Sequence, residues 1–353
     1  MEYPDIGIRY LTAITDSTGI IQHSSFAIPN RNHGYTTDDN ARALIAAIQE
    51  YDKSTTDELL LLITTYLSFI HHAHNPGYGF MNCMSYQRDF LDINGTDDCL
   101  GRCLWACGYA SSANIPERIR ITAKWLFDET FLLVDNLRSP RAKAYALMGI
   151  HHYLGKNPIK PGYLDRIVRM ADSLCDGMRA FTDSNWQWYE PYFTYGNAIL
   201  PMGMMASAGI TGSAAYDDVA RKSLDFLSEM LIIDGQLDLI GNNGWYLKGG
   251  KRAIFDQQTI DAGYTVMMFA EGFDRYGGEK YKEAAMISYE WFFGRNRSGL
   301  SVYDVETGGC FDAIIDSGVN QNQGAESIIC ILMAQNAVRN IIAKAAEINN
   351  LSD

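Results

Sequence analysis

Two kinds of helix-like segment alternate along the 353-residue chain. Segments of the first kind are amphipathic, with apolar residues at helical period and charged residues between them, as in a helix that packs on one face only. They cover residues 57–72, 116–132, 163–181, 214–233 and 279–293, and a shorter one at residues 6–15 opens the series. These segments predict an outer layer of helices.

Segments of the second kind are rich in small residues and would be apolar on nearly all faces of a helix, for example ALIAAI from Ala43 and GYTVMMFA from Gly263. Each follows a polar or acidic start, and the six starts cover residues 38–42, 97–102, 139–143, 195–198, 256–262 and 323–327. Their spacing of roughly 40 to 70 residues is the size of a helical hairpin plus a variable loop. We therefore predict one all-α domain over residues 1–353, an (α/α)6 toroid with an inner and an outer ring of helices.

The connecting loops predict which rim of the toroid carries function. Connections that leave an inner helix are short, at residues 52–55, 111–115 and 209–212, whereas those that enter one are long, at residues 16–37, 75–96, 234–255 and 295–322. Because the helices alternate in direction, the long loops share one rim with the N-termini of the inner helices. Long loops are usually functional. We expect short β-hairpins in these loops, with tight turns at Asn94-Gly95 and Asn243-Gly244.

Composition and charge exclude several partners. The chain has 29 basic and 42 acidic residues and a net charge of −13, which disfavours nucleic acid, anionic membranes and strongly anionic polysaccharides. The longest apolar runs, such as residues 59–63, are too short to cross a bilayer. We expect no metal and no cofactor, because the cysteines lack metal spacing and no phosphate loop, G-x-S-x-G or H-E-x-x-H motif is present.

The first residues lack the basic and apolar regions of a signal peptide. We therefore expect a cytoplasmic protein, with a periplasmic location as the alternative if the sequence has been trimmed.

Acidic residues gather at the predicted starts of the inner helices. Asp38 and Asp39 open the first inner helix, and Asp97 and Asp98 hold the equivalent positions in the second. An aspartate at a helix start is a good N-cap, worth about 1 kcal/mol, so we expect one of each pair to cap its helix. The other carboxylate costs repulsion unless a cation pairs with it. The arginine one turn further on is the expected partner, so Asp39 and Arg42 would form an ion pair.

Cleavage of a glycosidic bond needs two carboxyl groups, one protonated and one ionised. Glu190 is the first choice for the proton donor, because aromatic, apolar surroundings raise the pKa of a carboxyl group. Its neighbours along the chain are Trp186, Trp188, Tyr189 and Tyr192. A structural or substrate-binding role is the alternative for Glu190. The second carboxyl group stays open among Asp38, Asp39, Asp97, Asp98 and Asp261, and a water nucleophile across a wide cleft would invert the anomeric configuration.

Loops rich in tryptophan and tyrosine are typical of sugar-binding clefts, because aromatic rings pack against the C–H faces of a pyranose. His33 precedes a glycine-containing loop at the predicted rim, whereas the histidine pairs at residues 71–72 and 151–152 lie at the ends of helices. We expect the substrate contacts to come from His33, Tyr35, Arg42, Arg102, Trp186, Trp188, Tyr195, Asn197, Trp245, Gln257, Gln258 and Glu326.

Residues 33–44, HGYTTDDNARAL, resemble a motif of a bacterial family in the six-hairpin glycosidase-like superfamily. Further stretches that resemble this family are residues 22–24, Glu190 with residues 195–201, residues 256–262 and residues 324–327. The resemblance implies an (α/α)6 fold and action on a glycan, without catalytic assignments. Some members resemble domains that are fused to glycosyltransferases, which implies a functional link to such an enzyme.

The residues favour a glycoside hydrolase that acts on a neutral, mannose-containing oligosaccharide. A sugar epimerase or polysaccharide lyase is one alternative. A lyase needs cations that neutralise a uronate, and the rim arginines are sparse. Epimerases of this architecture use histidine pairs near the cavity, and here the pairs at residues 71–72 and 151–152 end helices far from the rim. The other alternative is a non-catalytic glycan-binding domain that works with a glycosyltransferase.

Overall fold

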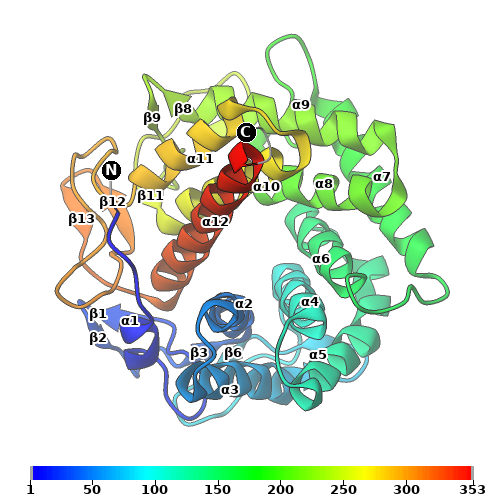
Figure 1. Ribbon diagram of the computed structural model, residues 1–353, viewed down its shortest axis with the longest axis vertical. Helices are drawn as coiled ribbons and strands as arrows, with labels where there is room; N and C mark the ends of the chain where they lie inside the picture. Colours follow the sequence, from blue (N-terminus) through cyan, green and yellow to red (C-terminus); the bar gives the residue numbers. More distant parts are fainter. Residues whose placement is uncertain (1–2, 351–353) are drawn as a thin grey trace.

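A computed structural model describes residues 3–350 and confirms the (α/α)6 toroid (Figure 1). Six inner helices surround a common axis: α2 (Thr37–Lys53), α4 (Asp97–Ser112), α6 (Pro140–Tyr153), α8 (Ile199–Thr211), α10 (Thr259–Tyr276) and α12 (Ala325–Asn350). The outer ring consists of α1 (Arg9–Ala13), α3 (Asp57–Ala73), α5 (Glu117–Thr130) with the short 3-10 helix η1 (Phe131–Asn136), α7 (Tyr163–Phe181), α9 (Ala214–Leu231) and α11 (Glu279–Glu290). Both layers lie where the two kinds of segment predicted them.

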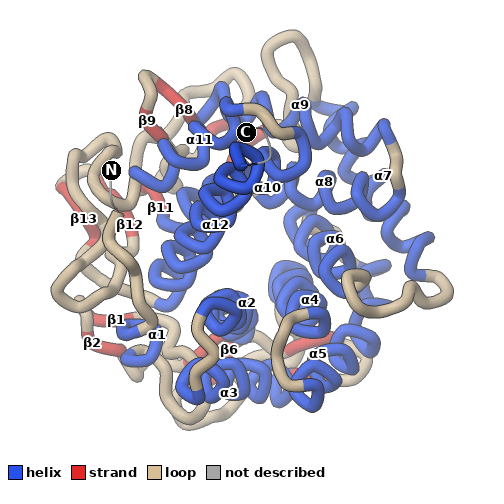
Figure 2. The backbone as a smooth tube through the Cα atoms, in the orientation of Figure 1, coloured by secondary structure: helices blue, strands red, loops and turns tan. Residues whose placement is uncertain are grey.

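Figure 2 shows the two rings of helices, and the burial of their side chains differs as their sequences require. The first ten residues of α8 are all buried, whereas α7 buries one stripe and exposes the rest. Inner helices approach closely where glycines face each other. A Cβ atom added at Gly108 in α4 would lie 2.0 Å from the carbonyl oxygen of Gly149 in α6. The contact between these two helices therefore requires glycine.

Short strands occur only in the loops of the described chain that enter inner helices. Hairpins form between β1 (Ser24–Ser25) and β2 (Ile28–Pro29), β4 (His74–Asn75) and β5 (Gly79–Phe80), and β8 (Ile232–Ile233) and β9 (Gln236–Leu237). Strand β3 (Tyr35–Thr36) pairs with β6 (Cys83–Met84), and β7 (Tyr192–Phe193) pairs with β10 (Tyr246–Leu247). A three-stranded sheet has the order β11 (Gln257–Gln258), β12 (Ala313–Ile315) and β13 (Gly318–Asn320).

Asn243-Gly244 lies in a turn, with a φ of 116° at Gly244, but neither this dipeptide nor Asn94-Gly95 joins two paired strands, so the expected hairpins do not form there. The tight turn between β8 and β9 is made by Asp234-Gly235 instead, with φ angles of 51° and 72°. Two positive φ angles are what a type I′ hairpin turn demands.

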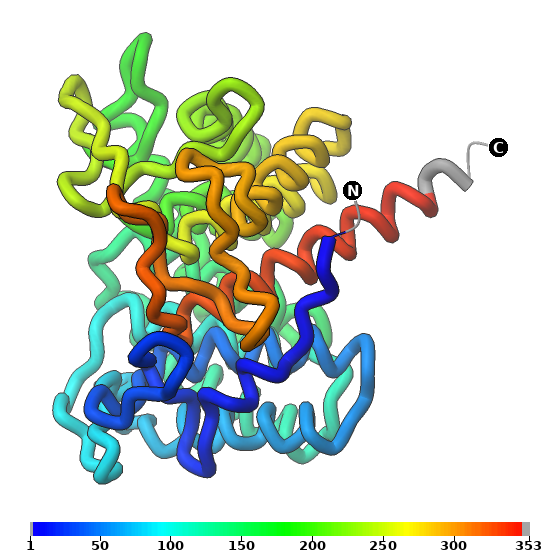
Figure 3. Tube along the Cα trace, turned by 90° about the vertical axis from the view of Figure 1, so that its left-hand side faces the viewer, coloured from blue at the N-terminus to red at the C-terminus, as the bar shows by residue number. Residues whose placement is uncertain are grey.

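The long loops and the N-termini of the inner helices share one rim, as predicted. Figure 3 shows α12 running from this loop-rich side to its C-terminal end on the other side of the toroid. One segment of the described chain, Ala325–Glu347, is long and apolar enough to cross a membrane by length and composition, and 61% of its apolar window is buried within the barrel. An inner helix of a toroid needs the same composition.

Candidate active site

A closed ring of polar contacts joins the starts of the six inner helices. At least one hydrogen bond or ion pair links each pair of neighbouring inner helices. The link runs either directly between the two helices or through the segment just before one of them. The links are Arg42–Glu326, Arg102–Asp38, Ser139–Asp98, Arg141–Tyr195, Gly196–Asp261 and Thr259–Ser327. Since these contacts fix the helix starts relative to one another, the side chains on this rim are held in place before any ligand binds.

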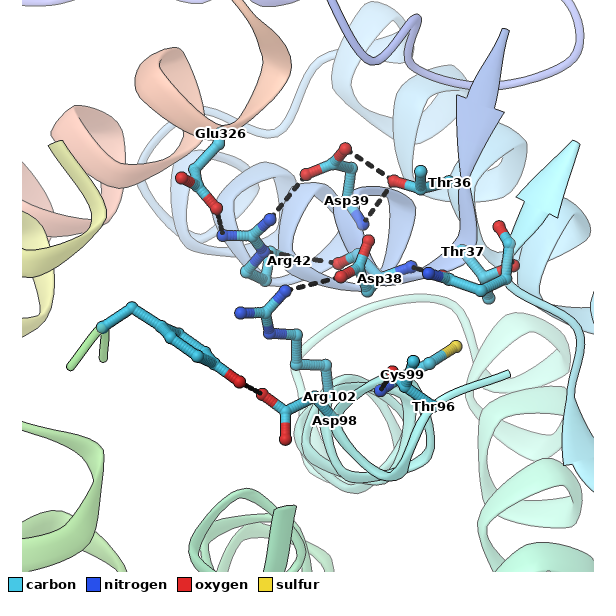
Figure 4. Close-up of polar contacts among 12 residues, drawn as sticks. Thr36, Thr37, Asp38, Asp39, Arg42, Thr96, Asp98, Cys99, Arg102 and Glu326 are labelled. Atoms are coloured by element: carbon cyan, nitrogen blue, oxygen red, sulfur yellow. Dashed lines mark hydrogen bonds and ion pairs between the residues drawn. The ribbon is translucent and has the colours of Figure 1, made fainter. Parts of the chain in front are cut away.

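Two arginines organise the carboxylates at the start of α2 (Figure 4). The guanidinium of Arg42 binds Asp39 Oδ1 through Nη2 at 2.5 Å and Glu326 Oε2 through Nη1 at 2.8 Å. Arg102, from α4, binds Asp38 Oδ2 through Nη1 at 2.5 Å. The predicted Asp39–Arg42 pair is therefore present, whereas Arg102 pairs with the neighbouring helix and not with its own aspartates.

The helix caps differ from the expectation. Thr36 caps α2 and Thr96 caps α4, each accepting a hydrogen bond from the backbone N–H three residues on, so the expected capping aspartates are wrong. Asp97 instead accepts hydrogen bonds from the backbone N–H groups of Arg138 and Ser139 through Oδ2, at 2.7 and 2.9 Å. It thereby supports the start of α6.

Asp98 also turns toward α6 and the segment before α8. It accepts hydrogen bonds from Ser139 Oγ and from the Tyr195 hydroxyl, both at 2.8 Å. The second aspartate pair therefore serves the contacts between helices.

Burial and the two arginines shift the pKa values of the neighbouring carboxyls Asp38 and Asp39 in opposite directions. Burial opposes ionisation of Asp38, but the guanidinium groups of Arg102 and Arg42 outweigh it and lower its pKa below the ordinary 3.8. Burial raises the pKa of Asp39 to about 6, against the attraction of Arg42 and with a further rise from the Asp38 charge. A third carboxyl, Asp261 on α10, also has its pKa raised by burial, to about 7.

Asp38 and Asp39 open onto a cavity of about 340 Å³ at the rim, whereas Asp261 is not part of its lining. Its acidic members are Asp38, Asp39, Asp256, Asp312 and Glu326. The remaining lining residues are Gln22, His23, Arg42, Arg102, Asn242, Gln258, Ala313, Asn320, Gly324 and Ser327. Three long loops, those before α2, α10 and α12, and the starts of α2, α4 and α12 contribute to this set, so the cavity depends on the closed ring.

Aromatic side chains close the barrel axis beneath Arg102. Trp105 lies 5.7 Å from Tyr145 and 6.1 Å from Tyr264 between ring centroids, and all three are buried. Helices α4 and α10 are not neighbours in the ring, so the contact between Trp105 and Tyr264 crosses the axis. The Arg102 guanidinium lies 5.4 Å from the centre of the Tyr145 ring. The cavity is therefore open at the rim and has a floor.

Asp312 and His23 are among the lining residues that the sequence reasoning missed. Asp312 Oδ1 accepts hydrogen bonds from Gly324 N and Ser327 Oγ, both at 2.7 Å, and burial raises its pKa. The His23 ring lies 4.8 Å from the His33 ring, and burial lowers the pKa of His23. A histidine pair therefore does lie at the rim, contrary to the expectation. The family resemblance at residues 22–24 was the available signal for His23, and no pattern marked Asp312.

Several predicted sugar contacts are core residues. Tyr35, Trp186, Trp188 and Gln257 are at most 3% exposed and are not part of the cavity lining. Their roles as sugar contacts stay predictions. Trp186 and Trp188 pack against Phe193 within the loop before α8, and Gln257 bonds to Asp238 and Trp291.

Glu190 lies away from the cavity lining. It is buried and pairs with Arg141 through Oε2 at 2.8 Å. Arg141 also binds Asn197 Oδ1 at 3.2 Å, and its guanidinium lies 5.1 Å from the Tyr195 ring centre. Trp245 lies next to this group, with its ring 6.4 Å from Tyr195. Glu190, Asn197 and Tyr195 therefore form a second polar cluster beside the cavity, and the role of Glu190 as proton donor stays a prediction.

Comparison with known proteins identifies the fold. No protein-family model matches the sequence, and no curated protein matches it. Among solved structures, cellobiose 2-epimerase from Spirochaeta thermophila has 12% identity over 96% of this chain and 94% of that chain, with a TM-score of 0.73. D-mannose isomerase has 11% identity over 95% of each chain, with a TM-score of 0.72.

An inactive α-1,6-mannanase variant of Salegentibacter, solved with α-1,6-mannotriose, has 14% identity over 94% of this chain and 96% of that chain, with a TM-score of 0.65. These neighbours are six-hairpin glycosidase-like enzymes. At this identity the likeness establishes the toroid fold alone, and the resemblance to a particular family stays a prediction. The finer motif resemblance and the glycosyltransferase link stay predictions.

Proposed function

We propose that this protein hydrolyses a glycosidic bond of a neutral, mannose-containing oligosaccharide in the rim cavity. Asp39 donates the proton to the leaving oxygen, and ionised Asp38 activates the attacking water. The reaction inverts the anomeric configuration, because water and not a carboxylate attacks the sugar.

The opposite protonation of two neighbouring carboxyls carries this proposal. Asp39, with a pKa of about 6, retains its proton in mildly acidic solution, while Arg102 holds Asp38 ionised. Pairs of carboxyls whose surroundings push their pKa values apart are the arrangement that acid–base hydrolases use. Glu190 is less suited to proton donation in this cavity, because it lies outside the cavity lining.

The mannanase neighbour supports the same reading. Its inactive variant has two consecutive aspartates replaced by asparagine. This chain has three pairs of consecutive aspartates, at residues 38–39, 97–98 and 217–218, and only Asp38 and Asp39 line the cavity. Asp97 and Asp98 bind the start of α6. The first pair is therefore the one we assign to catalysis.

A glycan panel that includes α-1,6-linked mannotriose tests the assignment, with reducing ends measured and the anomeric product read by NMR. Asp38→Asn and Asp39→Asn should each lower kcat by about 10²–10⁴. Asp218→Asn is the matched control, since Asp218 is exposed on α9 and pairs only with Lys222. Full activity of both cavity variants would contradict the proposal, and glycan binding without turnover in the wild type would favour the accessory-domain alternative.

A sugar epimerase or isomerase is the second candidate, favoured by the His23–His33 pair beside the cavity. Two of the structural neighbours are named for such reactions. Proton transfer at a sugar carbon exchanges that proton with solvent. Incubation of mannose, glucose and cellobiose in D₂O, followed by NMR at C2, would show deuterium with no new reducing ends. Loss of that exchange in His23→Gln, but not in His151→Gln at the opposite end of the barrel, would establish the alternative.

A further inference from the structure

Two aromatic residues of the rim loops hold a backbone conformation that bulky side chains avoid. Within the described chain, four residues other than glycine have a positive φ: Phe26 at 54°, Arg88 at 72°, Asp234 at 51° and Trp245 at 56°. Aspartate tolerates this region in turns, whereas it is unfavourable for a bulky aromatic residue. Phe26 and Trp245 therefore need an explanation outside local preference.

Phe26 is held in this conformation by hydrogen bonds on both sides of its backbone. It occupies the first position of the two-residue turn between β1 and β2, where a positive φ favours glycine. Its N–H donates to Asn322 Oδ1 at 2.9 Å, and its carbonyl accepts from Gln323 N at 3.0 Å and from Ser24 Oγ. The phenyl ring is 65% exposed, so it contributes little to the core.

The clamped turn stands at the edge of the cavity. Gln22 and His23, from the same loop, line the cavity. The residues that clamp Phe26 lead directly into Gly324 and Glu326, which line it from the other chain segment. The exposed ring is thus carried by two segments that both form the cavity wall.

Trp245 has the corresponding place on another loop. Its carbonyl accepts a hydrogen bond from Ala253 N at 2.8 Å, and Asn242, three residues earlier, lines the cavity. Its ring is half-buried and faces Tyr195, whose hydroxyl binds Asp98. The indole therefore lies next to the second polar cluster, with its ring tilted by 51° from that of Tyr195.

We propose that Phe26 and Trp245 are stacking platforms for sugar rings on either side of the unit held in the cavity, so that the ligand is an oligosaccharide of at least three units. This inference rests on the proposed function. A pyranose is the occupant that fits, because its C–H face packs on an aromatic ring while its hydroxyls meet the polar, acidic lining. Unfavourable φ angles that persist because the surroundings enforce them cluster at ligand sites.

Titration calorimetry with mannose and with α-1,6-linked mannobiose, mannotriose and mannotetraose tests the proposal. The protein carries Asp38→Asn, so that turnover does not consume the ligand. Affinity should rise with length up to the trisaccharide. Phe26→Ala should lower the affinity for mannotriose about fivefold to tenfold and leave the affinity for mannose unchanged. Leu61→Ala, which removes an equally exposed side chain (66%) from outer helix α3, should change neither.

A second variant separates binding from folding. Phe26→Gly should lose the same affinity while its Tm stays equal to or above that of the wild type, because glycine accepts the positive φ freely. Equal length dependence in the wild type and in both Phe26 variants would overturn the platforms. So would a change confined to the oligomeric state measured by sedimentation, which would make the Phe26 turn a contact between copies of the chain.

The two proposals fail separately. Hydrolysis by the wild type with no effect of Phe26 on length dependence overturns only the platforms. Length-dependent binding that requires Phe26, without hydrolysis by the wild type, overturns only the hydrolase function.

Discussion

Asp261 should cost the protein stability at neutral pH, and replacing it by asparagine should recover that cost. The carboxyl is 7% exposed in the first turn of α10, where Oδ1 accepts a hydrogen bond from Gly196 N at 2.7 Å. Asparagine keeps an oxygen for this bond and removes the charge. Asp261→Asn therefore changes the protonation of one buried group and little of the packing.

The magnitude follows from the pKa. Burial raises the pKa of Asp261 from 3.8 to about 7, opposed by the Gly196 N–H and increased by the Glu326 charge. At about 1.4 kcal/mol for each pH unit, the ionised carboxylate costs at most about 4 kcal/mol. Because the folded-state pKa lies above the unfolded one, the folded protein holds the extra proton. The stabilisation is complete below pH 3.8 and is lost as the pH rises to about 7.

Urea unfolding of the wild type and Asp261→Asn at pH 5, 6, 7 and 8 measures this difference. The asparagine variant should gain on the wild type by up to about 1.4 kcal/mol per pH unit and level off above pH 7. Asp218→Asn, at an exposed site, should show no such trend. A variant that is less stable than the wild type at pH 8, or a difference independent of pH, would refute the reasoning.

Three further predictions concern the rim and the helix contacts. Arg42→Met leaves the buried Asp39 without its cation and should lower the unfolding free energy by about 3–5 kcal/mol at pH 8, measured in urea, with a smaller loss at pH 5 where Asp39 holds its proton. Gly108→Ala places a Cβ atom 2.0 Å from Gly149 O and should lower the unfolding free energy by about 3 kcal/mol or more. This loss would be measured as a lower Tm, although the substitution leaves every cavity residue in place. If Asp39 is the proton donor, kcat/KM should fall as the pH rises above about 6, and a profile flat to pH 9 would exclude that role.

The helical layers follow from the chain because hydrophobic period depends on short-range spacing. The alternation of amphipathic and fully apolar segments predicts which helix lies inside, and loop length predicts the functional rim. Strand pairing is different. Strand β7 pairs with β10 more than fifty residues later, and no turn residue between them indicates that register. The Asn-Gly dipeptides at residues 94–95 and 243–244 do not mark β-hairpins for the same reason, since a hairpin turn needs two strands that pair across it.

The candidate site likewise contains contacts that local spacing predicts and contacts that depend on the fold. The Asp39–Arg42 pair lies within one helix turn and could be predicted from spacing. Arg102 pairs with Asp38 of the neighbouring helix, because the offset between two packed helices decides which carboxylate it reaches. Aromatic density around Glu190 is equally typical of a core and of a sugar cleft. Trp186 and Trp188 belong to the core, and only the folded chain distinguishes the two cases.

Features that cost folding free energy coincide at the loop-rich rim. Asp39 and Asp261 are buried with raised pKa values, and Phe26 and Trp245 hold an unfavourable φ. The packing of the barrel requires none of them, because an amide would satisfy Gly196 and a glycine would suit the turn at residue 26. Natural sequences follow local rules except where function outweighs them. Asp39 lines the cavity and the other three lie on the same rim, and this coincidence favours catalysis at that rim. The exposed Phe26 ring beside the cavity favours an oligosaccharide over a single sugar as the ligand. An isomerase specific for mannose would not need such a ring.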